Sequence, residues 1–217
     1  MHDDIPSEPA FSQLPLKVKG SLLRRDDIVA TSVEVLGALT ARGSITTTRL
    51  KISGECSVAN ACVAHQVKNL GSLRVRSLQA EEIHSSGYFS ATQETTTGSL
   101  YAEGAVRMSS LTARDSIEIR LGNACSIDKM GAGGEISILL SSTPFSFLMG
   151  PLRKMNCGTI TGTTIRLERT SADLVCGEDV TIGPGCIIQE LHYSKRLNVD
   201  SKSKVKKVVF LPDREAT

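Results

Sequence analysis

The chain contains no tryptophan, and aromatic residues make up only 4% of its 217 residues. A globular core of ordinary size usually holds more aromatic side chains than this. Hydrophobic residues still reach 40% of the sequence, which is enough to form a buried core. The composition therefore favours a narrow interior filled by aliphatic side chains.

Short catalytic and metal-binding motifs are also missing. The sequence has no Walker loop, no GxSxG motif and no strand–GxGxxG–helix unit. Its histidines, His2, His65, His84 and His192, form neither an HxH nor an HExxH arrangement. We therefore expect no catalytic residue, no bound cofactor and no metal ligand.

Charge and hydropathy exclude further classes of protein. The net charge is +2 and no basic stripe is present, so we expect no nucleic-acid partner. No run of about 18 apolar residues occurs, so we expect no transmembrane segment. The acidic N-terminus MHDDIPSEPAF does not follow the pattern of a signal peptide, which favours a cytoplasmic protein.

The six cysteines form no CxxC pair. Cys56, Cys62 and Cys186 fall at positions where other repeats carry aliphatic residues, so we interpret them as small buried hydrophobic side chains. An even number of cysteines indicates disulfides mainly in short secreted chains. We expect free thiols here.

Glycines recur at nearly constant spacing between residues 20 and 122. They stand at Gly20, Gly37, Gly54, Gly71, Gly87, Gly104 and Gly122. The successive steps are 17, 17, 17, 16, 17 and 18 residues. Such an even period indicates a coil with one turn per repeat. Glycine suits a corner of this coil, where φ can be positive and backbones approach closely.

Apolar residues follow the same period. They recur two, eight and thirteen residues after a glycine, as Leu39, Ile45 and Leu50 do after Gly37. This spacing predicts an all-β fold, a parallel β-helix (β-solenoid) with three short strands in each turn of about 17 residues. Stacked turns cover one another's inward residues. Right-handed crossovers are the rule for parallel strands, so we expect a right-handed coil, although the spacing itself does not determine the hand.

The rhythm predicts where the coil begins, breaks and ends. We expect a flexible N-terminal tail at 1–14, a β-helix at 15–211 with an irregular insertion around 122–157, and a C-terminal tail at 212–217. Residues 136–152 carry no charge, which is compatible with an interaction patch or a membrane-touching loop. Two prolines and four serines favour a buried strand followed by an insertion that packs on the coil.

Alternation returns after Cys157. The apolar residues that alternate with polar ones there are Ile160, Ile165, Leu167, Leu174, Val180, Ile182, Cys186 and Ile188. Lys202, Lys204, Lys206 and Lys207 then suit an exposed edge strand, on which lysine discourages stray pairing. Contact of these lysines with phosphate or acidic lipid is the alternative.

The segment VTIGPGCIIQ, residues 180–189, resembles the hexapeptide repeat of left-handed β-helix acyltransferases. Such enzymes use a histidine at a cleft between subunits to deprotonate the acceptor, and His192 is the nearby candidate. The six-residue period holds for about two steps here, whereas the 17-residue period holds for six. An acyltransferase is therefore the alternative to a structural protein.

The repeats VKGSL, VLGALTARGSI and LGSLRV, together with VCGEDVTIGPGCIIQELHY, resemble the bactofilins, polymer-forming cytoskeletal proteins of bacteria. The closing segment is similar to the longer bactofilin-like proteins of Gram-positive bacteria, and the resemblance covers residues 16–211. It implies a right-handed parallel β-helix that polymerises end to end without nucleotide. The length and the break at 122–157 depart from the compact family pattern, so small oligomers stay an alternative.

These features predict a non-enzymatic scaffold that is its own partner, as a homo-oligomer or polymer. We expect it in the cytoplasm, peripheral to the membrane and close to envelope-associated proteins. The residues expected to carry self-association are Leu16, Val18 and Leu22 at one end and Val205, Val208 and Phe210 at the other. A surface adhesin on the same coil is a third possibility, which the absence of a signal pattern disfavours.

Overall fold

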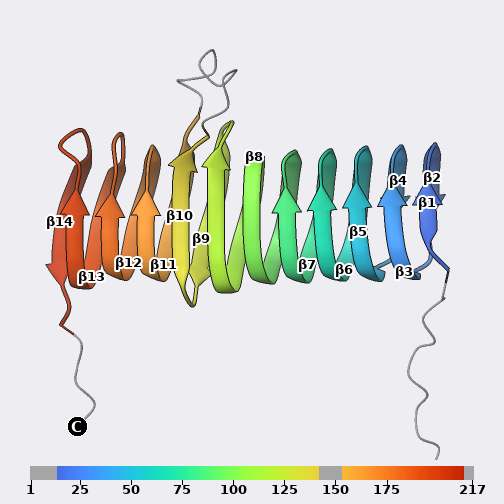
Figure 1. Cartoon of the computed structure of the whole chain (residues 1–217), viewed down its shortest axis with the longest axis horizontal. Helices are drawn as coiled ribbons and strands as arrows, with labels where there is room; N and C mark the ends of the chain where they lie inside the picture. The colour runs from blue at the N-terminus through green and yellow to red at the C-terminus, as the bar shows by residue number, and fades with distance from the viewer. Residues whose placement is uncertain (1–13, 142–152, 213–217) are drawn as a thin grey trace, which may run out of the picture.

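The computed structural model describes residues 14–141 and 153–212. These residues form a parallel β-solenoid of about 11 turns, which confirms the predicted fold class. Figure 1 shows the turns stacked side by side in one row, with the first turn at one end and the last turn at the other. Of the predicted tails at 1–14 and 212–217, residues 1–13 and 213–217 lie outside the described residues.

All strands belong to one sheet of 14 strands that winds around the coil. The strands are β1 (Leu16–Val18), β2 (Ser21–Arg24), β3 (Ile28–Val35), β4 (Ala38–Ala41), β5 (Ile45–Ile52), β6 (Glu55–Asn69), β7 (Ser72–Ser85), β8 (Tyr88–Leu121), β9 (Cys125–Ala132), β10 (Glu135–Leu140), β11 (Met155–Leu167), β12 (Thr170–Ile182), β13 (Ile187–Val199) and β14 (Lys204–Phe210). Every strand pair among the described residues is parallel, as expected for successive turns of a coil.

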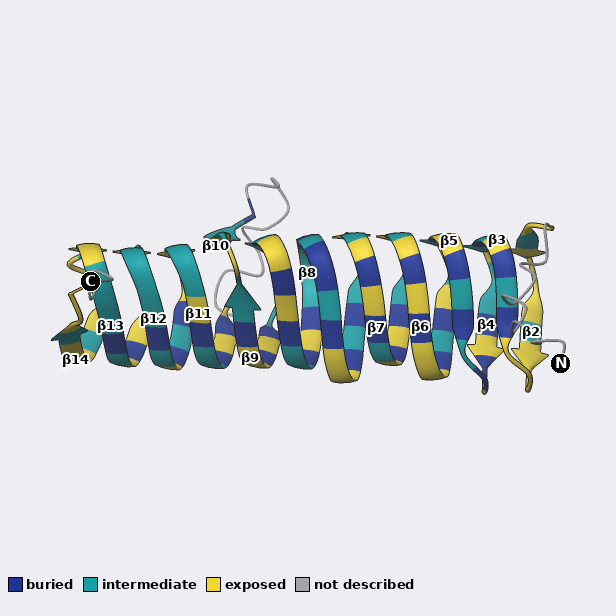
Figure 2. Cartoon of the chain, turned by 90° about the horizontal axis from the view of Figure 1, so that it is seen from below, coloured by how far each residue is buried: buried dark blue, intermediate teal, exposed yellow. Residues whose placement is uncertain are grey.

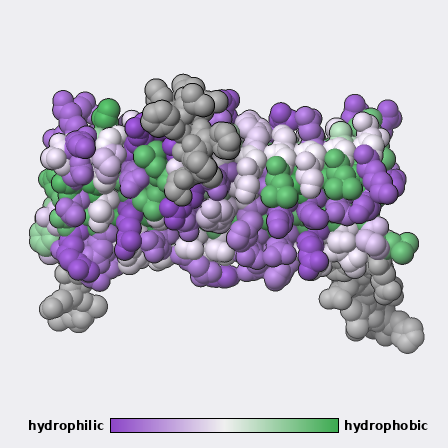
Figure 3. Space-filling model, turned by 45° about the horizontal axis from the view of Figure 1, so that its top comes forward, coloured by the Kyte–Doolittle hydropathy of each residue, from purple (hydrophilic) through white to green (hydrophobic). Residues whose placement is uncertain are grey.

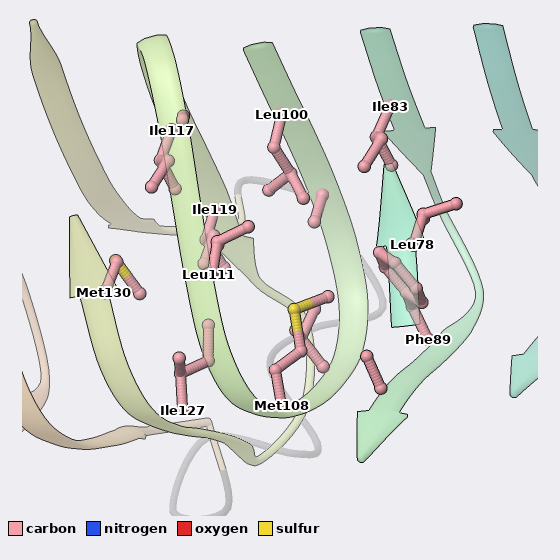
Figure 4. Close-up of a cluster of buried hydrophobic side chains, with 14 of the residues drawn as sticks. Leu78, Ile83, Phe89, Leu100, Met108, Leu111, Ile117, Ile119, Ile127 and Met130 are labelled. Atoms are coloured by element: carbon pink, nitrogen blue, oxygen red, sulfur yellow. The ribbon is translucent and has the colours of Figure 1, made fainter. Parts of the chain in front are cut away.

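The inward rows agree with the predicted positions. Leu39, Ile45 and Leu50 are at most 1% exposed, and their counterparts in the following turns are buried in the same way. Figure 4 shows part of this interior, where Ile83, Leu100 and Ile117 come from successive turns and lie in one row. Dark and light bands alternate along the strands in Figure 2 because every second residue points inward.

The expected corners are present, but strand pairing often continues around them. The turn that β6 forms contains three inward pairs, Cys56/Val58, Cys62/Ala64 and Val67/Asn69, on one strand of 15 residues. Only the glycine corner interrupts the strands there. The Thr- and Ser-rich residues 88–99 are likewise strand, inside β8.

The structure supplies the reason for the glycine period. A Cβ atom on Gly54 would lie 2.0 Å from the carbonyl oxygen of Gly37, and one on Gly71 would lie 2.1 Å from that of Gly54. The same Gly37 oxygen accepts a hydrogen bond from the N–H of Glu55 at 2.8 Å. Close approach of stacked turns is therefore what excludes a side chain. Positive φ contributes in this series only at Gly104, where φ is +132°.

Turn length varies after the first turns. Ile28 pairs with Ile45, and Ile45 pairs with Cys62, so the early turns keep the predicted period of 17 residues. Ile160, in contrast, pairs with Val175, so that turn is shorter. The short turns have glycine at an inward position, and a Cβ on Gly162 would lie 3.1 Å from the Cδ1 atom of Ile136. Val175 faces the core there, so the predicted alternation through Leu174 is wrong at this point.

The break expected around 122–157 contains two regular strands. Within it, β9 pairs with β8 and β11, and β10 pairs with the same two strands. Residues 142–152, which include much of the uncharged stretch, lie outside the described residues. At the base of this segment, the Arg153 side chain is 6% exposed and its Nε atom donates to the carbonyl oxygen of Leu121 at 2.8 Å.

Replacing Gly54 by alanine should lower the free energy of unfolding by about 3 kcal/mol, because the new Cβ would overlap a carbonyl oxygen that cannot move without breaking coil pairing. Gly131→Ala is the matched control, since the only atom within 4 Å of its added Cβ is the Thr161 oxygen at 3.9 Å. Urea unfolding of both variants measures the effect. Equal midpoints for the two would contradict the close-approach explanation.

Candidate self-association surfaces at the coil ends

The last turn leaves its inward rows uncovered among the described residues. Val199 and Val208 are 39% and 48% exposed, and Phe210 is 54% exposed. The neighbours of Val199 and Val208 one turn earlier, Ile182 and Leu191, are at most 1% exposed, and Tyr193, the neighbour of Phe210, is partly buried. These three side chains therefore continue the inward rows at the last described turn, and we call them the C-terminal open rows.

Three further side chains complete this end of the core. The ring of Phe210 lies 5.2 Å from the ring of Tyr193, tilted by 52°, so the two aromatic residues extend one inward row. Val205 and Leu197 are partly buried against the core. In Figure 3, hydrophobic residues come to the surface among hydrophilic ones at the left, where the last turns lie.

The backbone at both ends offers an open sheet edge within the described chain. There, β14 pairs only with β13, while β1 pairs only with β3 and β2 only with β4. The outer N–H and C=O groups of such edge strands can pair with another strand. The ends are therefore the places where a further turn can be added without disturbing the coil.

The N-terminal end is more closed than the C-terminal end. Val18, Ile28 and Ala30 are 4%, 7% and 3% exposed. Leu16 and Leu22 are partly buried against the core. A recess of about 250 Å³ lies at this end, and its lining includes Leu14, Leu16, Asp26, Asp27, Ile28 and Ala30. The recess is thus lined by apolar residues together with Arg24 and the two aspartates.

Charged residues follow the outward rows and pair between turns. Glu34 lies 2.6 Å from Lys17 in the turn before and 3.2 Å from Lys51 in the turn after. Hydrogen bonds from these two lysines lower the pKa of the Glu34 carboxyl group. Lys207 in the last turn lies 2.9 Å from Glu190. Opposite charges therefore pair between some successive turns, although Lys68 follows Lys51 in the same row.

The six residues predicted for self-association differ in how far they are exposed. Val208 and Phe210 are exposed, and Val205 is partly buried, all on β14. Leu16 and Leu22 are partly buried on β1 and β2, whereas Val18 is almost fully buried. Sequence reasoning missed Val199. Its place one full turn after Ile182, which lies in an inward row, was the available signal.

The hexapeptide-like segment forms the end of β12, a corner and the start of β13. Gly185 at this corner has a φ of +76°, and the following Cys186 is buried. The Nε2 atom of His192 lies 2.7 Å from the Oε1 atom of Glu190, and the histidine side chain is 24% exposed. Hydrogen bonds from Lys207 and His192 lower the pKa of Glu190.

Candidate metal and redox groups are sparse in the part of the chain that the structure describes. No three His, Cys, Asp or Glu side chains gather there in an arrangement that could hold a metal ion. All six cysteines are free, and burial raises the pKa of Cys56, Cys62 and Cys157 to about 12. Neutral, buried thiols of this kind act as small hydrophobic side chains, as predicted for Cys56, Cys62 and Cys186.

Fold and ends together define the class of protein: a parallel β-solenoid whose final turn exposes its core rows. Within residues 14–141 and 153–212, no helix is long and apolar enough to cross a membrane.

Comparison with known proteins finds one similar curated protein, and neither a family model nor a solved structure matches. The chain is 33% identical over 92 residues to the uncharacterized protein YhbF of Bacillus subtilis (strain 168). This match covers 42% of the chain and 39% of YhbF, so the chain spans about two fifths of that relative's length.

Thiol labelling should reproduce the burial pattern. In the folded protein at pH 8.5, iodoacetamide should modify Cys176 first, because the other five cysteines are buried. Unfolding in urea should release all six. Burial raises the pKa of the Cys56 and Cys62 thiols in the folded protein above that in the unfolded chain. Their contribution to the free energy of unfolding is therefore fully present below about pH 8.5 and is lost as the pH rises towards 12. Mass spectrometry of labelled peptides is the measurement, and rapid native labelling of Cys56 would contradict the buried assignment.

Proposed function

We propose that this protein is a bactofilin-like, non-enzymatic cytoskeletal scaffold that self-associates through its coil ends without nucleotide. It would act in the cytoplasm, peripheral to the membrane and together with envelope-associated proteins. The proposal unites the glycine period, the resemblance of its repeats and the solenoid fold. Its main support is the set of C-terminal open rows, because apolar side chains exposed to water favour association with a second apolar surface.

The energy available at one end is modest. Burying the exposed half of a Val or Phe side chain stabilises a contact by about 1 kcal/mol. Three such residues and a few edge hydrogen bonds compete with an association cost of at least about 4 kcal/mol. Association through one end is therefore expected to be reversible and to depend on protein concentration, which suits a dynamic polymer.

Charges placed in the inward rows of the ends should prevent assembly. Leu22→Asp and Val208→Asp would each put a carboxylate where a second copy buries an apolar side chain, and both variants should stay monomeric. Val63→Asp is the matched control, because Val63 is 41% exposed but lies on β6, away from the ends. Negative-stain microscopy and light scattering over a range of concentrations give the readout. Filaments formed by Val208→Asp would rule out this end as the contact.

The paired His192 and Glu190 favour a second candidate, an acyltransferase, because a carboxylate beside an imidazole can orient it as a general base. That function predicts a trimer and stabilisation by acyl donors. A thermal-shift titration with coenzyme A and acetyl-coenzyme A tests it, with His192→Gln as the control. An increase in melting temperature that His192→Gln retains would report donor binding without a role for the histidine, and no increase would remove the enzyme candidate.

A further inference from the structure

We propose that the outward face of β11, β12 and β13, together with the corners beside these strands, binds a phosphorylated polyhydroxy compound such as a sugar phosphate. The site lies on the side of the coil and does not depend on the proposed self-association. Three observations carry the inference: a groove lined by cations, an adjoining groove lined by carboxylate, amide and hydroxyl groups, and an apolar side chain between them.

Outward residues of successive turns form three parallel rows on this face. Asn156 pairs with Ser171 and Ser171 pairs with Ile187, and these three residues form the middle row. Every second residue of a strand points outward, so the positions two residues before and two residues after also align between turns. The row before, which we call the cation row, contains Lys154, Arg169, Gly185 and Lys202. The row after, which we call the carboxylate row, contains Asp128, Gly158, Asp173 and Gln189.

The cation row borders a groove of about 520 Å³, the cation groove. None of the described residues that line it is acidic, and four are positively charged: Arg153, Lys154, Arg169 and Lys202. The Nε atom of Arg153 donates to the carbonyl oxygen of Leu121, so a neutral acceptor holds this charge in place. Lys154 and Lys202 are exposed, and neither forms an ion pair with another described residue.

Two carboxylates close to these cations in the sequence bond to the backbone instead. The Oε2 atom of Glu168 accepts the N–H of Leu140 at 3.0 Å, and the Oδ1 atom of Asp200 accepts the N–H of Lys202 at 2.7 Å. Neither Glu168 nor Asp200 lines the cation groove. Lysine and arginine side chains gathered in this way recognise a phosphate group, whose two charges and several oxygens accept more than one charged donor.

The backbone of Arg169 supports this assignment. Its φ is +45°, and it is the one non-glycine residue with positive φ in the described part of the chain. This conformation is uncommon for residues other than glycine, asparagine and aspartate, and such outliers gather at functional sites. A Cβ atom on Gly185, the next residue of the cation row, would lie 3.3 Å from the Cγ atom of Arg169. The arginine stem therefore extends over Gly185, in the direction of Lys202.

The carboxylate row supplies partners for hydroxyl groups. Asp128 and Asp173 stand on either side of Gly158 in this row, and both line a second groove of about 520 Å³. Asn156 and Gln189 line the same groove. Carboxylate oxygens accept hydrogen bonds from hydroxyl groups, and side-chain amides both donate and accept. The two aspartates would repel a phosphate, which therefore binds on the cation row and not here.

The two grooves are continuous, because both are lined by Ser171 and Ile187. Ile187 is 48% exposed at the centre of the face, where it offers an apolar surface to the C–H groups of a sugar ring. The outer rows lie about 13 Å apart, since a strand advances about 3.3 Å per residue. Long side chains on both rows shorten this gap, so a ligand with a phosphate at one end and hydroxyl groups at the other can reach both.

Isothermal titration calorimetry with glucose 6-phosphate, glucose and inorganic phosphate tests the site. Glucose 6-phosphate should bind more tightly than either of the other two. Lys154→Gln and Lys202→Gln should each weaken its binding about tenfold, because each removes a charged donor to the phosphate. Lys68→Gln is the matched control, since Lys68 is an exposed lysine on β6, and it should bind as the wild type does.

Asp173→Ala separates the two halves of the site. It should weaken the binding of glucose 6-phosphate severalfold and leave the binding of inorganic phosphate unchanged or tighter, because a negative charge near the phosphate has been removed. Melting temperatures show that the variants are folded. Equal losses for both ligands in folded Asp173→Ala would contradict the assignment of hydroxyl groups to the carboxylate row.

A phosphatidylglycerol headgroup has the same chemistry, and flotation with phosphatidylglycerol vesicles, against phosphatidylcholine vesicles, distinguishes this source from a soluble ligand. Vesicle binding that Lys154→Gln and Lys202→Gln abolish and Lys68→Gln retains, without binding of glucose 6-phosphate, would assign the site to the lipid. Absence of binding in both experiments, or binding that Lys154→Gln and Lys202→Gln retain, would overturn the inference and leave the proposed self-association standing.

Discussion

The close contact between backbones at the glycine corner is the constraint on which the whole solenoid depends. The carbonyl oxygen of Gly37 accepts the N–H of Glu55, while the space beside it, 2.0 Å from the oxygen, is where a Cβ of Gly54 would have to lie. Turns can be stacked at hydrogen-bonding distance only if this position carries no side chain. Once one corner is aligned in this way, equivalent residues of all turns fall into rows.

The alignment of equivalent residues in rows explains the composition of both the interior and the surface of the coil. Inward rows bury aliphatic residues, and a polar member such as Asn69 is accommodated because its side chain bonds to Ser85, to the Tyr88 oxygen and to the Gly71 N–H. Outward rows hold charges that pair between turns, as Glu34 does with Lys17 and Lys51. The same stacking that satisfies each middle turn leaves the final one with exposed core residues.

Much of the fold followed from the sequence, because a repeat forces local pattern and tertiary packing to coincide. The inward positions represented by Leu39, Ile45 and Leu50 were predicted correctly, and so was the burial of Cys56, Cys62 and Cys186. The period failed where the turns become shorter, since Val175 rather than Leu174 then points inward. Insertions and bulges at corners change the turn length without changing the alternation, so the alternation alone cannot reveal them.

The glycine repeat was enough to predict a coil with one turn per repeat, the positions of its glycine corners and the side chains that fill the core of its regular turns. Which end of the described coil exposes its core rows became apparent from the folded structure alone. Val18 and Val208 are both valines on terminal strands, yet they are 4% and 48% exposed. Exposure at an end depends on what lies across the terminal turn, whereas the repeat records only the contacts of a turn with its neighbours.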